Sequence, residues 1–189
     1  MKHAILTTTL LLLSLSVVYA QWGWSEGYIV TNTLDTIHGK IQYTTPAIRS
    51  AKIMFRADEG DMQSETVRYR PFMIKGFMIA GEYFESRIYD IHPSLNYGLG
   101  VFMKRLDNGS GPVKLYEYWN TTQERGFTQL FITREGEPTY QLSTTRLRKQ
   151  LAQYFKDYEQ LHDRILNREF KRRDLPEVVA LYNQWKHAK

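Results

Sequence analysis

Apolar and polar residues alternate in short runs between positions 27 and 142, and this period of two is that of β-strands with one buried face. Turn-forming residues separate the runs at hairpin spacing. The clearest hairpin joins residues 100–106 to residues 113–119 through Asp107-Asn108-Gly109-Ser110-Gly111, whose Asn-Gly pair tolerates the positive φ of a tight turn. We therefore predict an antiparallel β-sheet or a partly open barrel of about eight short strands.

The hydrophobic period changes after residue 142. Apolar residues then recur at three- and four-residue spacing, which predicts three short helices with one apolar face each. The three groups are Leu147, Leu151, Tyr154, Phe155 and Tyr158; Leu161, Ile165 and Leu166; and Leu175, Val178, Val179, Tyr182 and Trp185. Asp174-Leu175-Pro176-Glu177 is typical of a capping box at the start of the last helix. We predict an α+β fold, with a β domain over residues 21–142 and a C-terminal three-helix segment over residues 143–189 packed on it.

The first twenty residues have a pattern of their own. Lys2 precedes an apolar run over residues 4–18, and Val18-Tyr19-Ala20 places small residues at the two positions that a signal peptidase recognises. The run contains several Ser and Thr residues and is shorter than the roughly twenty apolar residues of a spanning helix. We predict a signal peptide over residues 1–20, and an exported, periplasmic or extracellular protein that is not transmembrane after cleavage.

Cysteine is absent from all 189 residues. Disulfides, thiolate metal sites and thiol nucleophiles are therefore excluded, and an exported protein without disulfides fits a bacterial envelope better than a eukaryotic extracellular space. The net charge of +5 is unevenly distributed along the chain. Residues 143–189 hold 11 basic and 6 acidic residues, whereas residues 21–142 hold 13 and 14. The positive charge thus belongs to the predicted helical segment.

Several segments resemble an uncharacterised family of secreted bacterial cell-envelope proteins, a domain of unknown function. The resemblance begins with Gly27-Tyr28-Ile29-Val30-Thr31 and residues 35–41, which form the first hairpin in that family. It continues through residues 113–118 and 147–155 and ends in Val178-Val179 with Tyr182-Asn183. Relatives often carry a Cys-Pro pair where this chain has Tyr158-Glu159. The resemblance implies a location and an architecture, and no catalytic residue.

No compact catalytic or metal-binding motif is present. The chain has no His-x-x-x-His spacing, no Gly-x-Ser-x-Gly elbow and no Gly-rich phosphate loop. Asp90, His92 and Glu117 are the candidates for a catalytic site that forms only when the folded chain brings them together. A solvated turn is the ordinary alternative for Asp90 and His92. We expect no metal and no cofactor.

Two further groups are candidates for binding. Tyr116, Tyr118 and Trp119 cluster at the end of a predicted strand and could stack on a ligand, although alternate aromatic residues in a strand more often fill the core. Basic residues before the last helix could contact an anionic surface, or form an ordinary solvated face. These basic residues are Arg164, Arg168, Lys171, Arg172 and Arg173.

We therefore expect an exported protein of unknown function that acts as a non-catalytic envelope binding or interaction protein. Its partner would be another envelope protein or an anionic surface, and nucleic acid is not expected for an exported chain. Two alternatives remain open. One is a hydrolase with a convergent Asp/Glu/His site, and the other is a peripheral membrane-surface protein that binds through its basic C-terminal segment.

Overall fold

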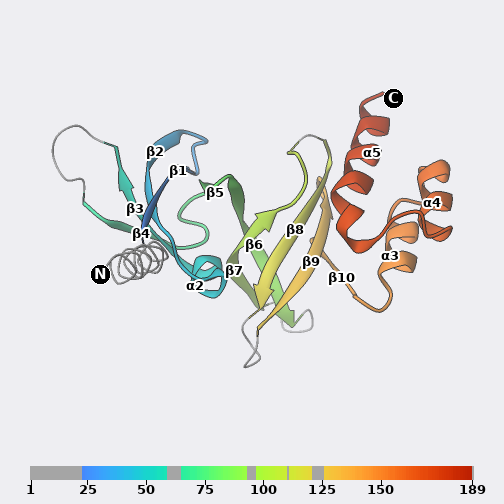
Figure 1. Ribbon diagram of the computed structural model, residues 1–189, viewed down its shortest axis with the longest axis horizontal. Coiled ribbons are helices and arrows are strands. Elements are labelled where there is room, and N and C mark those ends of the chain that lie inside the picture. Colours follow the sequence, from blue (N-terminus) through green and yellow to red (C-terminus); the bar gives the residue numbers. More distant parts are fainter. Residues whose placement is uncertain (1–22, 59–64, 93–96, 110, 121–125, 189) are drawn as a thin grey trace, which may run out of the picture.

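The computed structural model describes residues 23–58, 65–92, 97–109, 111–120 and 126–188. The predicted signal peptide, residues 1–20, lies outside the described residues. The described chain forms one open antiparallel sheet of ten strands, with the three C-terminal helices gathered at one end (Figure 1). The antiparallel sheet is confirmed, and it has ten strands where about eight were expected.

The strands run in the spatial order β10-β9-β8-β7-β6-β5-β1-β2-β3-β4. β1 is an interior strand that pairs with β2 on one side and with β5 on the other. The chain first leads outward from β1 to β4 and then returns to β5 and continues to β10. The bounds are β1 Trp24–Val30, β2 Thr36–Gln42, β3 Ile53–Ala57, β4 Val67–Tyr69, β5 Gly76–Ile79, β6 Glu82–His92, β7 Tyr97–Arg105, β8 Val113–Asn120, β9 Phe127–Arg134 and β10 Tyr140–Leu142.

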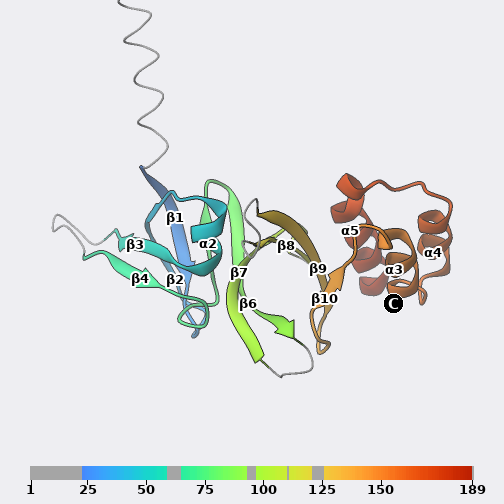
Figure 2. The same ribbon diagram turned by 90° about the horizontal axis from the view of Figure 1, so that it is seen from below.

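Four α-helices accompany the sheet in the described chain. α2 (Pro46–Ala51) packs on β7 and β8, whereas α3 (Leu147–Tyr154), α4 (Glu159–Leu166) and α5 (Leu175–His187) lie together beside β8, β9 and β10 (Figure 2). The predicted apolar stripes of the last three helices meet the sheet, where their buried residues form one core with Val113, Leu115, Leu130, Ile132 and Leu142. Burial of such side chains contributes about 1.5–3 kcal/mol each, so the helices are held mainly by this shared core.

A second core fills the other half of the sheet, and a third lies on the face of β7–β9 that points away from α5. The second core includes Ile29, Ile41, Phe55, Phe77 and Phe102. The third consists of Val101, Met103, Tyr116, Tyr118 and Phe131. Both faces of β8 are therefore buried, which explains why its apolar residues do not alternate strictly with polar ones.

The predicted hairpin between β7 and β8 is confirmed, and its strands separate early. Lys104 pairs with Glu117 and Arg105 with Tyr116, and the Leu106 N–H donates to the Leu115 carbonyl (2.9 Å) before the loop begins. The Asp107 carboxylate then accepts the Leu115 backbone N–H (2.9 Å) in place of a strand partner. Gly109 has the positive φ that the Asn-Gly pair predicted (89°).

Asn183 of α5 completes the pairing of β8. Its Oδ1 accepts the Val113 N–H (3.0 Å), and its Nδ2 donates to the Val113 carbonyl (2.9 Å). Gly111 makes room for this contact, because a Cβ at that position would lie 2.4 Å from Asn183 Cγ, and its φ of 94° also favours glycine. One buried amide thus joins α5 to the sheet through both backbone groups of a single residue.

The predicted capping box at Asp174 and Glu177 is wrong. The Asp174 carboxylate accepts the Lys171 backbone N–H (2.8 Å), and Asp174 makes no side-chain cap hydrogen bond to α5. A short 3-10 turn, Arg172–Asp174, precedes the helix and takes up this side chain. The proline in the first turn of α5 is present as predicted.

Among the described residues, no helix is both long and apolar enough to cross a membrane.

We expect Asn183→Ala to lower the free energy of unfolding by about 3 kcal/mol, because it leaves the buried N–H and carbonyl of Val113 without partners. The melting temperature should fall by about 6–12 °C. Urea and thermal unfolding followed by circular dichroism measure both quantities. Asn167→Ala, at an exposed position after α4, is the control and should stay within about 0.5 kcal/mol of the unmodified protein. Equal stability of the two variants would contradict a stabilising role of the Asn183 amide on Val113.

Candidate functional site

The three catalytic candidates lie on two strands. Glu117 is half-buried on β8. It lies opposite Lys104 of β7, which in turn lies opposite Phe84 of β6. The backbones of Asp90 and His92 lie at the far end of β6, where Asp90 is six residues beyond Phe84, or about 20 Å along the strand. The side chains of Asp90 and His92 are outside the described part of the structure. A joint site of the three residues therefore stays a prediction.

The structure divides the three aromatic candidates. Tyr116 and Tyr118 are buried in the core on β7–β9, so they are not available as a ligand platform, and the core alternative holds for them. Trp119 points to the opposite face of β8. There it lines a pocket of about 290 Å³ next to α2, and Glu117 lines the same pocket. The fold thus brings together two of the predicted site residues, one catalytic and one aromatic.

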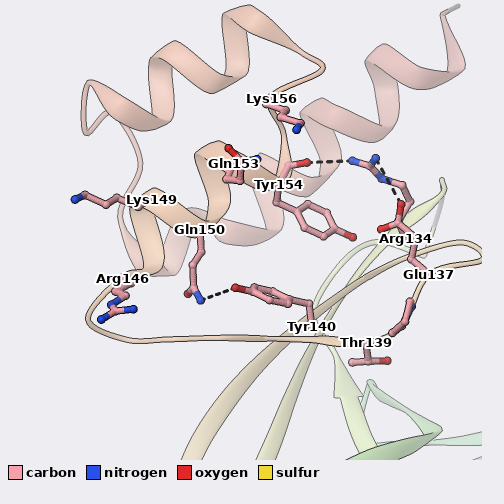
Figure 3. A pocket seen from close by; sticks show the side chains of 11 residues that line it. Arg134, Glu137, Thr139, Tyr140, Arg146, Lys149, Gln150, Gln153, Tyr154 and Lys156 are labelled. Atoms are coloured by element: carbon pink, nitrogen blue, oxygen red, sulfur yellow. Dashed lines mark hydrogen bonds and ion pairs between the residues drawn. The ribbon is translucent and has the colours of Figure 1, made fainter. Parts of the chain in front are cut away.

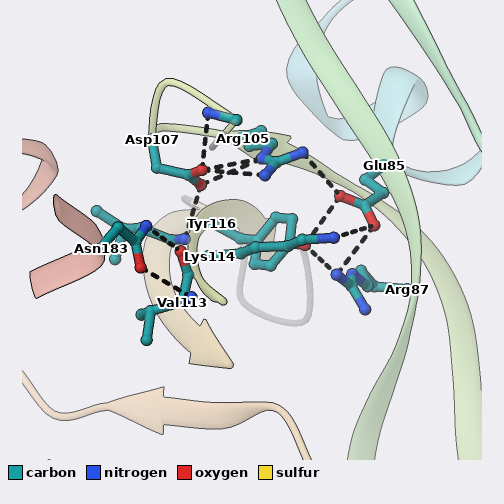
Figure 4. A network of polar contacts seen from close by, with 10 residues as sticks. Glu85, Arg87, Arg105, Asp107, Val113, Lys114, Tyr116 and Asn183 are labelled. Atoms are coloured by element: carbon teal, nitrogen blue, oxygen red, sulfur yellow. Dashed lines mark hydrogen bonds and ion pairs between the residues drawn. The ribbon is translucent and has the colours of Figure 1, made fainter. Parts of the chain in front are cut away.

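Tyr116 belongs to a polar network that joins β6, β7 and β8 (Figure 4). Its hydroxyl donates to Glu85 (2.8 Å) and accepts a hydrogen bond from Arg87. Glu85 also pairs with Arg87 (2.9 Å), Arg105 (3.8 Å) and Lys114 (3.9 Å). Burial and the charge of Glu85 raise the pKa of Tyr116, so its hydroxyl stays protonated and is no general base near neutral pH. The network joins three neighbouring strands through side-chain contacts.

Glu85→Gln should lower the free energy of unfolding by about 3 kcal/mol, because three neighbouring cations lose their shared carboxylate in a largely buried site. Glu117→Gln is the matched control, since no described residue forms an ion pair with Glu117, and it should change stability by less than about 0.5 kcal/mol. Chemical unfolding at neutral pH compares the two. A similar small effect for both variants would show that the network carries no stability.

The five basic candidates of the C-terminal segment are only partly free to bind an anion. Arg164 pairs with Glu169 (2.7 Å) and lies over the Phe170 ring, and Arg173 pairs with Asp174 (3.5 Å). Arg168, Lys171 and Arg172 have no ion-pair partner among the described residues. Two of the five cations are therefore neutralised by a neighbouring carboxylate, which fits the alternative of an ordinary solvated face.

A larger groove, about 710 Å³, lies between α3 and the connection from β9 to β10 (Figure 3). Pro138, Thr139 and Tyr140 form one side, and α3 with Lys156 forms the other. Gln150 fixes the distance between them, because it donates to the Tyr140 hydroxyl (2.8 Å) and accepts the Ser143 backbone N–H (2.7 Å). Two tyrosine rings, Tyr140 and Tyr154, give the groove an aromatic lining.

The inner end of the groove is held rigid by Arg134. Its guanidinium donates to the Tyr154 carbonyl (3.1 Å), pairs with Glu137 (3.8 Å) and Asp157 (3.7 Å), and lies over the rings of Tyr154 and Tyr182. Asp157 is buried enough to raise its pKa, yet hydrogen bonds from Tyr182 (2.6 Å) and Lys186 outweigh burial and lower it. The Arg134 charge is therefore already balanced.

The outer rim carries charge that is not balanced. Arg146, Lys149 and Lys156 line the groove, and no described carboxylate lies within ion-pair distance of any of them. Glu137 is the one acidic residue in the described lining, and it is paired with Arg134. The groove thus combines aromatic walls with three free cations at the opening, an arrangement that fits an anionic ligand with apolar parts.

Sequence reasoning missed this groove. A signal was nevertheless present, because Arg146, Lys149, Gln150 and Gln153 follow the three- and four-residue spacing of one helix face. The polar face of the predicted helix was thus basic, with no acid between residues 138 and 156. The β9–β10 side of the groove could not be anticipated, because pairing between a helix and a distant turn leaves no local pattern.

No group of three or more His, Cys, Asp or Glu side chains in the described chain comes together as a metal site. Comparisons with protein-family models, with curated proteins and with solved structures find no match. The resemblance to secreted envelope proteins therefore stays a prediction from the sequence.

Two tyrosines at the inner end of the groove, Tyr154 and Tyr182, should respond differently to loss of the hydroxyl. The Tyr154 hydroxyl is buried without a hydrogen-bond partner in the described structure, whereas Tyr182 donates to Asp157. Tyr154→Phe should leave the free energy of unfolding within about 0.5 kcal/mol at pH 7, and Tyr182→Phe should lower it by about 1.5–3 kcal/mol. Urea unfolding measures both, and a larger loss for Tyr154→Phe would contradict the assignment.

The pH dependence of stability supplies a second readout. Burial raises the pKa of Tyr154 to about 12 from the ordinary 10, against the opposing charge of Arg134. The pKa of Tyr154 is higher in the folded than in the unfolded chain. The contribution of protonated Tyr154 to the free energy of unfolding is therefore complete below about pH 10 and is lost as the pH rises through about 12. The unmodified protein should therefore lose stability over this range. Tyr154→Phe should reduce the slope, and an unchanged slope would contradict the raised pKa.

Proposed function

We propose that this chain is an exported, non-catalytic binding protein, and that its binding site is the basic groove between α3 and the β9–β10 connection. The proposed ligand is an acidic, extended segment of another envelope protein. The observation that carries the proposal is the set of three unpaired cations, Arg146, Lys149 and Lys156, around an aromatic-walled groove. Export rests on the sequence of residues 1–20.

Charge supports an anionic ligand. The cations at the rim are Arg146 just before α3, Lys149 within it and Lys156 after it, and the lining carboxylate Glu137 is already engaged by Arg134. Positive potential in a partly enclosed site attracts carboxylates and speeds their association. A neutral or cationic ligand would leave these three charges uncompensated.

The shape of the groove supports an extended peptide. The sheet ends at β10, so one edge of this three-residue strand has no strand partner in the described structure, and Tyr140 of β10 lines the groove. Open strand edges bind extended segments through backbone hydrogen bonds, while neighbouring pockets take alternate side chains. A flat membrane surface would contact only the rim cations, and would leave the aromatic walls unused.

The lining also favours binding over hydrolysis. Among the described residues that form the groove there is no histidine, and its single carboxylate is in an ion pair. A general acid–base pair therefore has no obvious members at this site. Tyr154 is no substitute, because its raised pKa keeps its hydroxyl protonated.

Fluorescence anisotropy with a short, labelled glutamate-rich peptide tests the proposal. We expect saturable binding that weakens as salt is added, since the rim charges are exposed and are screened. The double variant Arg146→Glu with Lys149→Glu should weaken binding by about tenfold or more. A glutamine-rich peptide of the same length should also bind the unmodified protein at least about tenfold more weakly than the acidic peptide does.

Lys52→Glu is the control for charge reversal, because Lys52 is exposed just after α2, on a different part of the chain. It should change affinity for the acidic peptide by less than about twofold. Polygalacturonate and vesicles of anionic lipid are the comparison ligands. If either binds in a groove-dependent manner while the peptide does not, or if Lys52→Glu weakens binding as much as the groove variant does, the proposal is wrong.

A further inference from the structure

The pocket beside α2 contains charges of both signs, and it is separate from the basic groove. Its volume is about 290 Å³, at the small end of the range for ligand sites. α2 supplies one wall and strands β6–β9 supply the other. Its described lining combines Arg49, Lys104, Glu82 and Glu117 with aromatic rings that include Trp119.

Arg49 is the most unusual of these residues. Its side chain is only 7% exposed, and its guanidinium lies over the rings of Tyr43 and Phe84, 5.1 and 5.2 Å from their centroids. The nearest carboxylate oxygen, Glu82 Oε2, is 3.8 Å from Nη1, which is too far for a hydrogen bond. Both Nε and Nη1 consequently lack a hydrogen-bond partner in the described structure. Buried donors in proteins are nearly always satisfied, so this guanidinium calls for an acceptor.

Glu82 does not fill that role, because it is shared with another cation. Lys104 donates to Glu82 Oε1, although the residue opposite Lys104 in the strand register is Glu117. Glu117 is thereby left without an ion-pair partner among the described residues. The pocket is electrically neutral as a whole, with two cations and two carboxylates, yet it holds one unsatisfied guanidinium and one unpaired carboxylate.

We propose that this pocket binds a small zwitterion, a free α-amino acid. The ligand carboxylate would bind Arg49, the ligand ammonium would bind Glu117, and the amino-acid side chain would lie against the aromatic walls. A zwitterion satisfies both charges and keeps the pocket neutral, whereas an anion or a cation alone leaves a charge unpaired in a partly buried site.

Binding requires a small movement of Arg49. Its two unsatisfied nitrogens are sealed from solvent in the free protein, so the guanidinium has to rotate toward the pocket. This rotation moves the rest of the Arg49 side chain as well, and Tyr43, which is 38% exposed, has to follow to keep its ring contact. The flat, forked guanidinium then offers two donors to the two oxygens of a carboxylate.

Isothermal titration calorimetry and saturation-transfer NMR with free L- and D-α-amino acids test this inference. At least one free amino acid should bind saturably, and its N-acetyl and its amide derivatives should each bind at least about tenfold more weakly. Arg49→Lys, which retains the charge without the fork, should also weaken binding at least tenfold. Circular dichroism establishes that this buried variant is folded.

Glu117→Gln keeps the test decisive if Arg49→Lys does not fold. Glu117 is half-buried and unpaired, so the variant should fold normally and bind the amino acid at least about tenfold more weakly. Glu137→Gln, a glutamate of the basic groove, is the matched control and should leave amino-acid affinity unchanged. Glu117→Gln should in turn leave acidic-peptide binding unchanged, which separates this pocket from the proposed function of the groove.

Three outcomes would overturn the inference. One is equal binding of the free and the blocked amino acids, and another is saturable binding of a neutral monosaccharide with no response to any amino acid. The third is the absence of saturable binding by every amino acid tested while the protein is folded.

Discussion

The early separation of β7 from β8 is the constraint on which the helical end of the molecule depends. The last bond of the hairpin joins the Leu106 N–H to the Leu115 carbonyl, so the buried Leu115 N–H and the backbone groups of Val113 need other partners on that side. Asp107 supplies one from within the hairpin loop, and Asn183 supplies two from α5. Apolar contacts alone would let α5 pack on the sheet in several positions. The two hydrogen bonds between the Asn183 side chain and the Val113 backbone select one of these positions.

A chain of charged and aromatic contacts connects α5 to the basic groove. Tyr182, next to Asn183, and Lys186 one turn later both bind Asp157 in the segment between α3 and α4. Asp157 in turn pairs with Arg134 of β9, which holds the Tyr154 carbonyl at the end of α3. Strand β9, helices α3 and α5, and the segment between α3 and α4 are thus held together at one end of the groove. The three cations at its opening belong to a rigid wall, which reduces the conformational entropy that a ligand must overcome.

The candidate site was only partly accessible from sequence. The stripe of Leu147, Leu151 and Phe155 predicted the buried face of α3, and the same period implied that Arg146 and Lys149 share the opposite face. Tyr116, Tyr118 and Trp119 looked alike as aromatic residues near a strand end, although Trp119 faces a pocket and the two tyrosines face a core. Alternation along β8 assigns them to two faces but does not reveal that both faces are covered. The isolated position of Arg49 gave no signal at all.

Local patterns determined the element types in this protein, because side-chain periods of two and of three to four follow directly from backbone geometry. They gave the antiparallel strands before residue 142, the β7–β8 hairpin with its Asn-Gly turn, and the three helices after residue 143. Only the tertiary structure decided the strand order around β1, the open edge at β10, and the pairing of Lys104 with Glu82 in place of Glu117. These features depend on contacts between residues far apart in the chain, and a charge or an aromatic ring acquires a role only from the neighbours that such contacts bring to it.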